Sequence, residues 1–513
     1  MLSIVALSTS LLSAGAAATA TSGAAPAKSA TANITRGGTL TIVEVSSNTI
    51  GIDPAGPTNT AGNIEFYPVF EPLFIQVKGN VEPWLASSYK TSNAAKTITI
   101  TLNKGIHFQD GTPFNAAAVV FNFNRFASIT QNSECVPFFK YYSNSTAIGS
   151  YKVQVNFTRP DPAFLSAISE ECGLMASPAA VTQYGANFGY HPVGTGPFTL
   201  SSYGLTGATY VKYPRYWRKG YPLLNQINMI LVGSNVTALD AVESGEAQLY
   251  YNTTAQDVIN ARAAGLHTVR IPDEEDTTDV GFNLSAPPFN NVVAREAVAH
   301  ALNPAPLTAE FGLGLYSAAQ SLISPGSWAF PGKSVKGYPT YDPTLAKQLA
   351  SQIPGGLNFS VIFGNTPVAV QEGSVIQAQL AAVGINMTLV PQQVSTFVSN
   401  IHAHTYQAWL SALASPAPPN DPDLIVYRYL DSTSNLNIDA VNDPTMDLLI
   451  QKTESTFNRP IRKADYAAIN QEIDKVLPWA YLFNTTYWDV ESSSLQNFDA
   501  SFEFPNYWDT WVK

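Results

Sequence analysis

Residues 359–390, FSVIFGNTPVAVQEGSVIQAQLAAVGINMTLV, carry the clearest sequence evidence for the fold. Phe359–Phe363 is a short apolar run typical of a buried strand, and Val370–Val383 is predicted to be a helix that ends at Gly384. Ile385–Val390 is again typical of a strand. A strand, a helix and a strand within about 30 residues form a βαβ unit, which implies parallel pairing.

The first part of the chain has a different pattern, in which strands alternate with single helices. Thr39–Val45 opens a strand, and Lys96–Leu102 and Tyr151–Phe157 alternate apolar and polar residues as half-buried strands do. Between them, Asn115 can cap a helix whose apolar residues, such as Phe123, share one face. This mixture predicts an α+β region.

The end of the chain returns to strand-like sequence. Ile461–Leu477 is predicted to be an amphipathic helix that ends at Pro478, and Trp479–Phe483 and Tyr487–Val490 are aromatic segments typical of strands. A pattern that changes and then returns indicates two lobes, with the C-terminal segment rejoining the first.

The composition describes a large globular chain and argues against one class of partner. Of 513 residues, 45% are apolar and 13% are charged, and at about 100–200 residues per domain this length allows several domains. Lys and Arg number 27 and Asp and Glu number 38, so the net charge is 27 − 38 = −11. Because a phosphate backbone is bound by a basic surface, nucleic acid is not an expected partner.

The N-terminus has the composition of a secretory signal. Residues 1–24 begin with an apolar stretch followed by small residues and are predicted to be a signal peptide, and residues 25–36 a flexible tether. No Lys or Arg precedes the apolar stretch, and an Ala-rich flexible terminus is the alternative. No later segment reaches the roughly 18–20 apolar residues that a membrane-spanning helix needs.

Two cysteines fit an exported protein. Cys135 and Cys172 are the one possible pair, and a disulfide between them would stabilise the fold by roughly 3–4 kcal/mol on the entropic model. Two buried free thiols are the alternative. Neither cysteine lies in a Cys-x-x-Cys motif, so redox catalysis and structural zinc have no support.

The sequence contains no familiar motif for catalysis or for a cofactor. His402 and His404 would place two imidazoles on one side of a strand, but no third metal ligand is identifiable, and exposed histidines are the alternative. The acidic run Asp273–Asp276 is predicted to be a solvated loop. A glycosidase needs two facing carboxylates, which no spacing reveals, so a secreted hydrolase stays open as an alternative.

The segment Trp409–Tyr429, WLSALASPAPPNDPDLIVYRY, contains the best candidate for a binding group. Asp421 lies in a Pro-rich loop after an apolar stretch, where its carboxylate could hold a ligand ammonium group beside the indole of Trp409. An ordinary surface turn is the alternative.

A series of short motifs runs in a fixed order from about Gly37 to Trp511. These motifs are Gly37-Gly38-Thr39-Leu40, Asp53-Pro54, Phe70-Glu71-Pro72-Leu73, Pro83-Trp84-Leu85-Ala86, Lys104–Phe114, Pro192–Phe198, Tyr216-Trp217, Ser244-Gly245-Glu246, Phe282-Asn283 and Pro288-Phe289. With this series the chain resembles the family 5 extracellular solute-binding proteins of ATP-binding-cassette (ABC) importers, the oligopeptide- and dipeptide-binding type.

The resemblance implies an α/β, two-lobed periplasmic-binding-protein fold of type II-like architecture, with a hinge between the lobes. Lobe one would contain residues 37–285 and 478–513, with an extra subdomain at about 72–190, and lobe two would contain residues 286–477. The lobes are expected to close on the ligand by a hinge motion.

The resemblance also implies a set of ligand-binding residues. Thr60, Ala61 and Gly62 match a loop whose backbone meets the ligand in relatives, and Phe282 and Asn283 lie where the chain crosses between lobes. Asp421 matches an acid that pairs with a peptide ammonium group, and Trp409 matches the aromatic residue that begins that segment. A structural role is the alternative for each.

Departures from the family pattern concern the substrate and the anchor. Asn365–Gln379 matches the stretch from which dipeptide binders supply an Arg for the ligand carboxylate, yet it contains no Arg or Lys. A longer peptide or a non-peptide solute is therefore favoured over a dipeptide. Ala301–Pro304 and Pro214 also depart from the usual motifs. Residues 12–16 lack the lipobox Cys, so a soluble periplasmic or extracellular protein is expected rather than a lipoprotein.

The expected function is that of a solute-binding component of an ABC importer. It would capture a peptide or other small solute, act as a monomer, deliver the solute to the permease subunits, and work without catalysis, metal or cofactor. The alternatives are the secreted hydrolase and a binding protein that serves as a ligand sensor.

Overall fold

The computed structural model describes residues 34–45, 51–56, 64–77, 80–129, 135–332, 337–413, 421–499 and 504–513. Residues 36–513 form one compact unit. The predicted signal peptide (1–24) and almost all of the predicted tether (25–36) lie outside the described residues.

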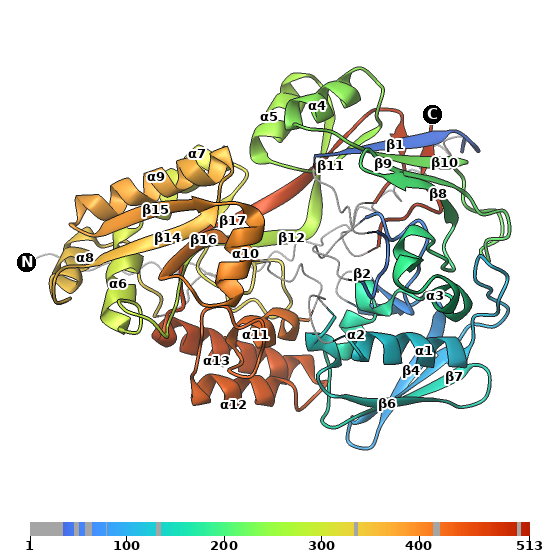
Figure 1. Ribbon diagram of the computed structural model, residues 1–513, viewed down its shortest axis with the longest axis horizontal. Coiled ribbons are helices and arrows are strands. Elements are labelled where there is room, and N and C mark those ends of the chain that lie inside the picture. Colours follow the sequence, from blue (N-terminus) through green and yellow to red (C-terminus); the bar gives the residue numbers. More distant parts are fainter. Residues whose placement is uncertain are drawn as a thin grey trace, which may run out of the picture. The chain divides into compact units, whose positions relative to one another are not determined.

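An eleven-stranded sheet runs through this unit (Figure 1). Its order is β15-β14-β16-β12-β17-β11-β1-β10-β9-β8, and β13 pairs with β17 off this path. The strands are β1 Thr39–Glu44, β8 Phe198–Gly204, β9 Gly207–Lys212, β10 Gln226–Leu231, β11 Leu249–Thr253, β12 His267–Phe282, β13 Ser317–Ala318, β14 Asn358–Gly364, β15 Asn386–Gln392, β16 Ala408–Leu413 and β17 Trp479–Glu491. β12 pairs with β16 and β17 pairs with β11, so these two long antiparallel strands connect the two ends of the sheet.

The predicted βαβ unit is confirmed. β14 and β15 pair in parallel from Asn358 opposite Asn386 to Gly364 opposite Gln392, and helix α9, Pro367–Ala382, connects them. The helix starts three residues earlier than predicted because the Thr366 side chain caps it and Pro367 occupies its first turn. Gly384 ends the connection with a φ of +83°, a conformation that favours glycine.

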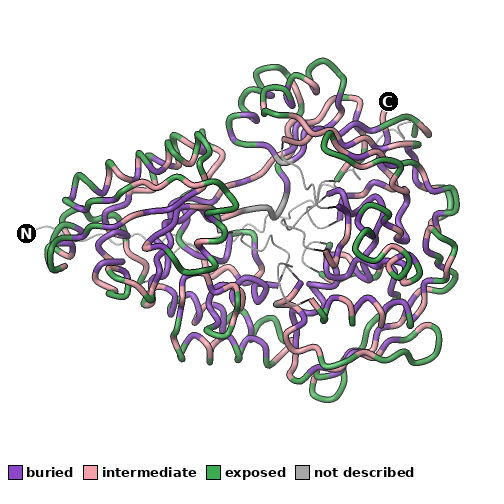
Figure 2. Tube along the Cα trace, viewed as in Figure 1, coloured by how far each residue is buried: buried purple, intermediate pink, exposed green. Residues whose placement is uncertain are grey.

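Helices cover both faces of the sheet at β14, β15 and β16 (Figures 1 and 2). Val361 and Leu410 pack in one core with α6 and α9, whereas Ile362 and Trp409 pack in another with α10, α11 and α13. Successive strand residues point to opposite faces, so burial on both faces explains why β14 and β16 are largely apolar, whereas the edge strand β15 exposes Asn386 and Thr388. The helices of this region are α6 Val292–Ala301, α7 Pro304–Gly312, α8 Pro343–Ala350, α10 Val394–His402, α11 Asp423–Leu430, α12 Pro444–Thr453 and α13 Arg459–Val476.

A four-stranded antiparallel sheet, β4-β5-β7-β6, shares a core with helix α1 inside residues 72–190, the range for which a subdomain is predicted and which we call the subdomain region. Its elements are β4 Ala86–Ser92, β5 Thr97–Leu102, α1 Ala116–Ala127, β6 Tyr142–Ala147, β7 Lys152–Phe157, α2 Phe164–Ala167 and α3 Pro178–Tyr184. Asn115 caps α1 as predicted, since its side chain accepts a hydrogen bond from the Ala118 amide at 3.1 Å. Cys135 and Cys172 form the predicted disulfide.

The remaining elements are short. They are β2 Phe74–Val77, β3 Asn80–Pro83, β18 Leu495–Gln496, β19 Trp511–Val512, helices α4 Asn235–Glu243 and α5 Ala255–Ala263, and the 3₁₀ turns η1 Pro137–Phe139, η2 Glu171–Gly173 and η3 Gly185–Tyr190.

Several of the ordered sequence motifs meet around one buried carboxylate, that of Glu71. It accepts hydrogen bonds from Trp84 Nε1 at 3.0 Å, the Tyr216 hydroxyl at 2.6 Å and Trp217 Nε1 at 2.8 Å. Burial raises the pKa of Glu71, while these donors oppose that shift. Motifs up to 146 residues apart in the chain therefore contact the same buried carboxylate.

Two local predictions are wrong. The acidic run at 273–276 is part of the long strand β12 rather than a loop, because β12 pairs with β17 on either side of a register shift between Arg270 and Glu275. His402 is the last residue of helix α10 rather than part of a strand, and His404 Nε2 lies 3.0 Å from the Asn437 carbonyl oxygen.

Candidate ligand-binding site

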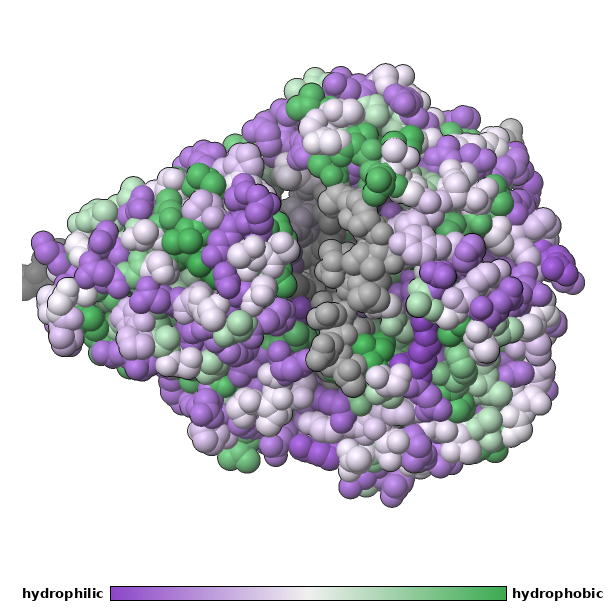
Figure 3. Space-filling model, viewed as in Figure 1, coloured by the Kyte–Doolittle hydropathy of each residue, from purple (hydrophilic) through white to green (hydrophobic). Residues whose placement is uncertain are grey.

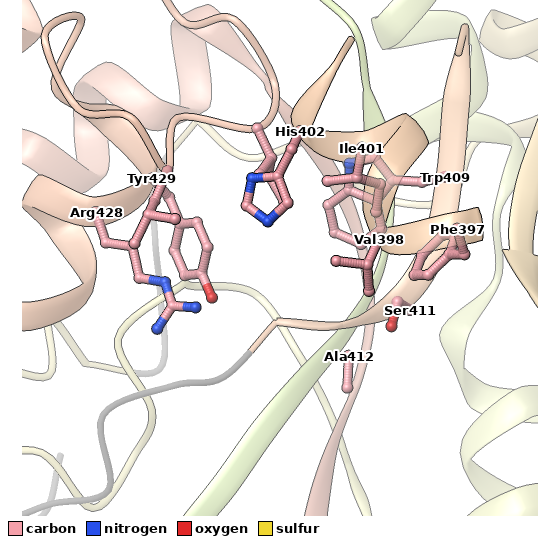
Figure 4. Close-up of a pocket in the computed structure, with 11 residues that line it drawn as sticks. Phe397, Val398, Ile401, His402, Trp409, Ser411, Ala412, Arg428 and Tyr429 are labelled. Atoms are coloured by element: carbon pink, nitrogen blue, oxygen red, sulfur yellow. The ribbon is translucent and has the colours of Figure 1, made fainter. Parts of the chain in front are cut away.

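A pocket of about 210 Å³ lies on the α10 face of the sheet, over strand β16 (Figure 4). Its lining residues are Phe397, Val398, Ile401 and His402 of α10, Trp409, Ser411 and Ala412 of β16, Arg428 and Tyr429 of α11, and Leu436 and Ile438. β14, β15 and β16 are parallel, and the pocket reaches toward the carboxyl end of β16, where α/β sheets usually bind ligands. Figure 3 shows hydrophilic and hydrophobic residues interspersed over this face of the molecule.

Helix α10 forms the apolar wall of the pocket. Phe397 and Ile401 lie one turn apart and are both buried against the sheet, whereas Val398 is 45% exposed. The sequence pattern of α10 thus fixes which side chains face the core and leaves His402, at the last position of the helix, exposed at the edge of the pocket.

The polar groups of the pocket are hydrogen-bond donors or carry positive charge. Figure 4 shows Arg428, Tyr429 and His402 around the open space, with Ser411 and Trp409 across from Arg428. The Arg428 guanidinium lies 5.2 Å from the centroid of the Tyr429 ring. No Asp or Glu occurs among the lining residues that the structure describes.

The indole of Trp409 is held in place by hydrogen bonding and close packing. Its Nε1 donates to Asp439 Oδ1 at 2.7 Å, and Trp479 Nε1 donates to Asp439 Oδ2 at 2.8 Å. Burial raises the pKa of Asp439 to about 7, while the indole donors oppose the shift. A Cβ on Gly281 would lie 2.0 Å from the indole, so only glycine fits there. Trp409 therefore presents a fixed aromatic surface to the pocket.

Asp421 lies outside the pocket lining and is already paired with a cation. Arg462 binds both of its carboxylate oxygens, with Nη2 at 2.5 Å from Oδ1, and the Tyr466 hydroxyl donates to Oδ1 at 3.1 Å. Burial alone would raise the pKa of Asp421, but Arg462 holds it below its usual value. An ammonium group would have to share this carboxylate with Arg462, and the predicted ligand role stays a prediction.

The other predicted site residues are buried or not described. Phe282 is fully buried against Phe289, with ring centroids 4.4 Å apart. The Asn283 side-chain amide donates to the carbonyls of His404 and Tyr406 at 3.0 and 2.9 Å. Thr60, Ala61 and Gly62 lie outside the described residues. Of the predicted residues that the structure describes, Trp409 is the one that lines the pocket.

An ion-pair cluster joins the subdomain region to helices α11 and α12, and we call it the Lys140 cluster. Lys140 Nζ lies 3.1 Å from Asp423 Oδ2 and 2.6 Å from Glu454 Oε1, and the Tyr141 hydroxyl donates to Glu454 Oε2 at 2.6 Å. Lys140 Nζ is also 3.3 Å from the centroid of the Tyr427 ring. The Lys140, Asp423 and Glu454 side chains are at most 10% exposed. Burial alone would lower the pKa of Lys140, but the two acids raise it above its usual value.

Sequence reasoning missed Arg428, Arg462 and Lys140. Arg428 lies inside the segment Trp409–Tyr429, between two tyrosines. Nothing in this local sequence indicates that helix α11 places Arg428 in the pocket over β16. Arg462 is 41 residues from Asp421 and Lys140 is 314 residues from Glu454, so no local pattern could pair them.

Comparisons with known proteins agree with this architecture. Residues 80–437 match the family model for bacterial extracellular solute-binding proteins, family 5 middle. A glutathione-binding protein, GsiB, of Escherichia coli O1:K1 is 30% identical over 350 residues, which are 67% of this chain and 68% of that protein.

Two solved structures share the fold. A dipeptide-binding protein from Pseudoalteromonas sp. SM9913, in complex with Met-Leu, has a TM-score of 0.81 at 22% identity over 93% of this chain and 100% of that chain. The oligopeptide-binding protein AppA from Bacillus subtilis, in complex with a nonapeptide, has a TM-score of 0.80 at 18% identity over 93% of this chain and 99% of that chain.

The fold and the pocket define a two-lobed solute-binding protein. More specifically, the chain belongs to the bacterial extracellular solute-binding proteins of family 5, which serve ABC importers outside the cytoplasm. The relatives found are binding proteins rather than enzymes. None of the helices in the described part of the chain is long and apolar enough to cross a membrane.

Proposed function

We propose that this protein captures a peptide or peptide-like solute between its two lobes and delivers it, chemically unchanged, to the permease of an ABC importer. The names of the relatives support the solute class, since they bind glutathione, a dipeptide and a nonapeptide. The observation that carries the proposal is the pocket beside the fixed Trp409 indole, at the carboxyl end of a parallel strand.

The lobes are proposed to be residues 37–285 with 478–513, and residues 286–477. By these bounds strands β12 and β17 belong to the first lobe, and they pair with β16 and β13 of the second, so we propose that the hinge lies at these two strands. Closure would bury the solute, and the Lys140 cluster would hold the lobes together at a second point of contact.

Trp409 is proposed as an aromatic wall of the site, and Thr60, Ala61 and Gly62 as backbone contacts from lobe one. Phe282 and Asn283 are proposed to act at the crossing between lobes, where the Asn283 amide fixes the chain at Tyr406. Asp421 is the residue whose proposed role as an ammonium partner most needs a direct test, because Arg462 already engages it.

A thermal-shift screen tests the proposal. Purified protein would be mixed with peptides of two to ten residues, glutathione, opines and sugars, since a ligand that binds only the folded state must raise the unfolding midpoint. We expect a shift with peptides or peptide-like solutes, followed by recovery of the bound solute intact by mass spectrometry. Silence with every peptide would overturn the peptide assignment, and recovery of a cleaved solute would favour the hydrolase alternative.

A further inference from the structure

We propose that capture of the solute is coupled to the uptake of one proton, which Asp161 receives beside the Lys140 cluster as the lobes close. The Lys140 cluster lies where the subdomain region of the first proposed lobe meets helices α11 and α12 of the second. This inference rests on the proposed function and deepens it, because it states what regulates the affinity of the site.

The groups that meet at this contact carry more negative than positive charge. The first lobe contributes Lys140, Arg159 and Asp161, and the second contributes Asp423 and Glu454. Arg159 is 3.9 Å from Glu454, and its side chain is 41% exposed. Lys140 is therefore the main counter-charge for three buried carboxyl groups.

The side chains around the cluster do not relieve this excess of negative charge. Arg462 of α13 binds both oxygens of Asp421, so its charge is matched there. The Tyr141 hydroxyl donates to the cluster, the Tyr427 ring lies 3.3 Å from the Lys140 ammonium, and the Tyr466 hydroxyl donates to Asp421. Burial raises the pKa of all three tyrosines above its usual value, so they stay neutral.

Asp161 is the acid best placed to hold a proton. It is 3% exposed, and its Oδ1 accepts a hydrogen bond from the Phe164 amide at 3.1 Å, whereas its Oδ2 is buried without a hydrogen bond to any described residue. Both oxygens of Glu454 accept hydrogen bonds, and Asp423 Oδ2 lies 3.1 Å from Lys140 Nζ. A buried carboxylate with so few partners is costly, and protonation removes its charge.

Closure changes the surroundings of Asp161, because Asp423 and Glu454 belong to the other lobe. With the lobes apart, Lys140 has Asp161 as its acidic neighbour in the first lobe, and Asp161 can ionise. With the lobes together, Lys140 is shared by three acids. Burial then raises the pKa of Asp161 to about 8, Lys140 opposes the shift, and Asp423 and Glu454 add to it. Burial raises the pKa of Glu454 less, to about 7.

The direction of the pH dependence follows from this difference between the two forms. Because the pKa of Asp161 is higher in the closed form, protonation favours closure fully below the pKa of the open form. This contribution is lost as the pH rises through about 8. Since coupling between two ligands is reciprocal, solute binding takes up a proton and acidic pH raises the affinity for the solute.

Titration calorimetry at pH 7 in two buffers with different enthalpies of ionisation measures the proton directly. The probe is the peptide, of two to ten residues, that gives the largest shift in the thermal-shift screen. The difference in heat between the buffers gives the number of protons bound with the solute, and we expect roughly 0.5–1 from Asp161. From pH 6 to pH 8 the affinity of the wild type should fall at least about tenfold.

Three variants assign the proton to its site. Asp161→Asn should lose this uptake, and its affinity should change less than about threefold from pH 6 to pH 8. Glu454→Gln removes one competitor for Lys140 without altering Asp161, and it should take up fewer protons than the wild type. Asp240→Asn, on the exposed surface of α4, is the matched control and should take up as many protons as the wild type.

A wild type that binds the peptide without proton uptake, or an Asp161→Asn variant that takes up as many protons as the wild type, overturns the inference and leaves the proposed function intact. If Asp161→Asn does not fold, undiminished proton uptake by Glu454→Gln overturns the inference in its place. A screen in which no peptide binds overturns the proposed function and this inference with it.

Discussion

Buried charges decide the behaviour of the site at the scale of single residues. The carboxylates of Glu71, Asp421 and Asp439 are all buried, yet each has different partners: three donors for Glu71, an arginine for Asp421 and two indoles for Asp439. A buried charge is stable only when it is paired or hydrogen-bonded, so the role of each carboxylate can be inferred from the groups that it binds. By this argument Asp421 belongs to a structural pair.

The pair predicts the outcome of replacing Asp421. Asp421→Leu leaves the Arg462 guanidinium buried without its partner, and we expect the free energy of unfolding to fall by about 3–5 kcal/mol in urea denaturation. The double variant Asp421→Leu, Arg462→Met should recover most of the loss. A variant of unchanged stability that binds peptides much more weakly would instead support the ammonium role.

Local sequence signals predicted some residues of the site and not others. Trp409 was predicted because it begins the segment that contains Asp421 and matches the aromatic residue at that place in the family that the chain resembles. Arg428 and Arg462 acquire their roles from packing between elements far apart in the chain, which a pattern read along the sequence does not contain.

Elements with strong local patterns were predicted well. β14, α9 and β15 match their predicted ranges to within a few residues, since an apolar strand, a capped helix and a left-handed glycine are all encoded within 30 or so neighbouring positions. β12 was missed at its acidic run because its pairing with β17 overrides the polar composition of residues 273–276.

The Lys140 cluster leads to a prediction about the contact between elements. We expect Lys140→Met to weaken binding of peptides found in the screen at least about tenfold, a loss of about 1.4 kcal/mol, because Asp423 and Glu454 then lose Lys140 in the closed form and the more distant Arg159, 3.9 Å from Glu454, remains. Calorimetry measures the affinity. Lys90→Met, on the exposed strand β4, is the control and should not change it. An unaltered affinity in Lys140→Met would contradict a role of the cluster in closure.

The disulfide tethers η2 to the segment that precedes η1. Its loop spans 37 residues, so Cys135→Ser with Cys172→Ser should lower the free energy of unfolding by roughly 3–4 kcal/mol on the entropic model. Guanidinium denaturation under oxidising and reducing conditions measures this: the wild type should lose stability on reduction and the double variant should not. Equal stability of the oxidised wild type and the variant would show that the bond contributes nothing.

At the scale of the whole molecule, buried acids make stability depend on pH. Burial raises the pKa of Glu44 to about 8, with Glu65 adding to the shift, and raises the pKa values of Asp439 and Asp474 to about 7. The folded state therefore holds these protons more tightly than the unfolded state, whose acids titrate near pH 4.

It follows that the free energy of unfolding falls as the pH rises from about 4.5 through 8. Urea denaturation at pH 5 and pH 8 should show the higher stability at pH 5, and Glu44→Gln should reduce the difference because it removes one of the titrating groups. Asp421, whose pKa is lowered, acts in the opposite sense at more acidic pH. A free energy of unfolding that rises between pH 5 and pH 8 would contradict the raised pKa values of these acids in the folded state.

The central claim is that a peptide-like solute is captured by closure of two lobes, and small-angle X-ray scattering of the purified protein tests it most directly. Scattering would be recorded without solute and with a saturating peptide from the thermal-shift screen. The account predicts a fall in the radius of gyration on binding, and a smaller fall in Lys140→Met at equal peptide concentration. Saturated binding with no change in the radius of gyration would contradict it.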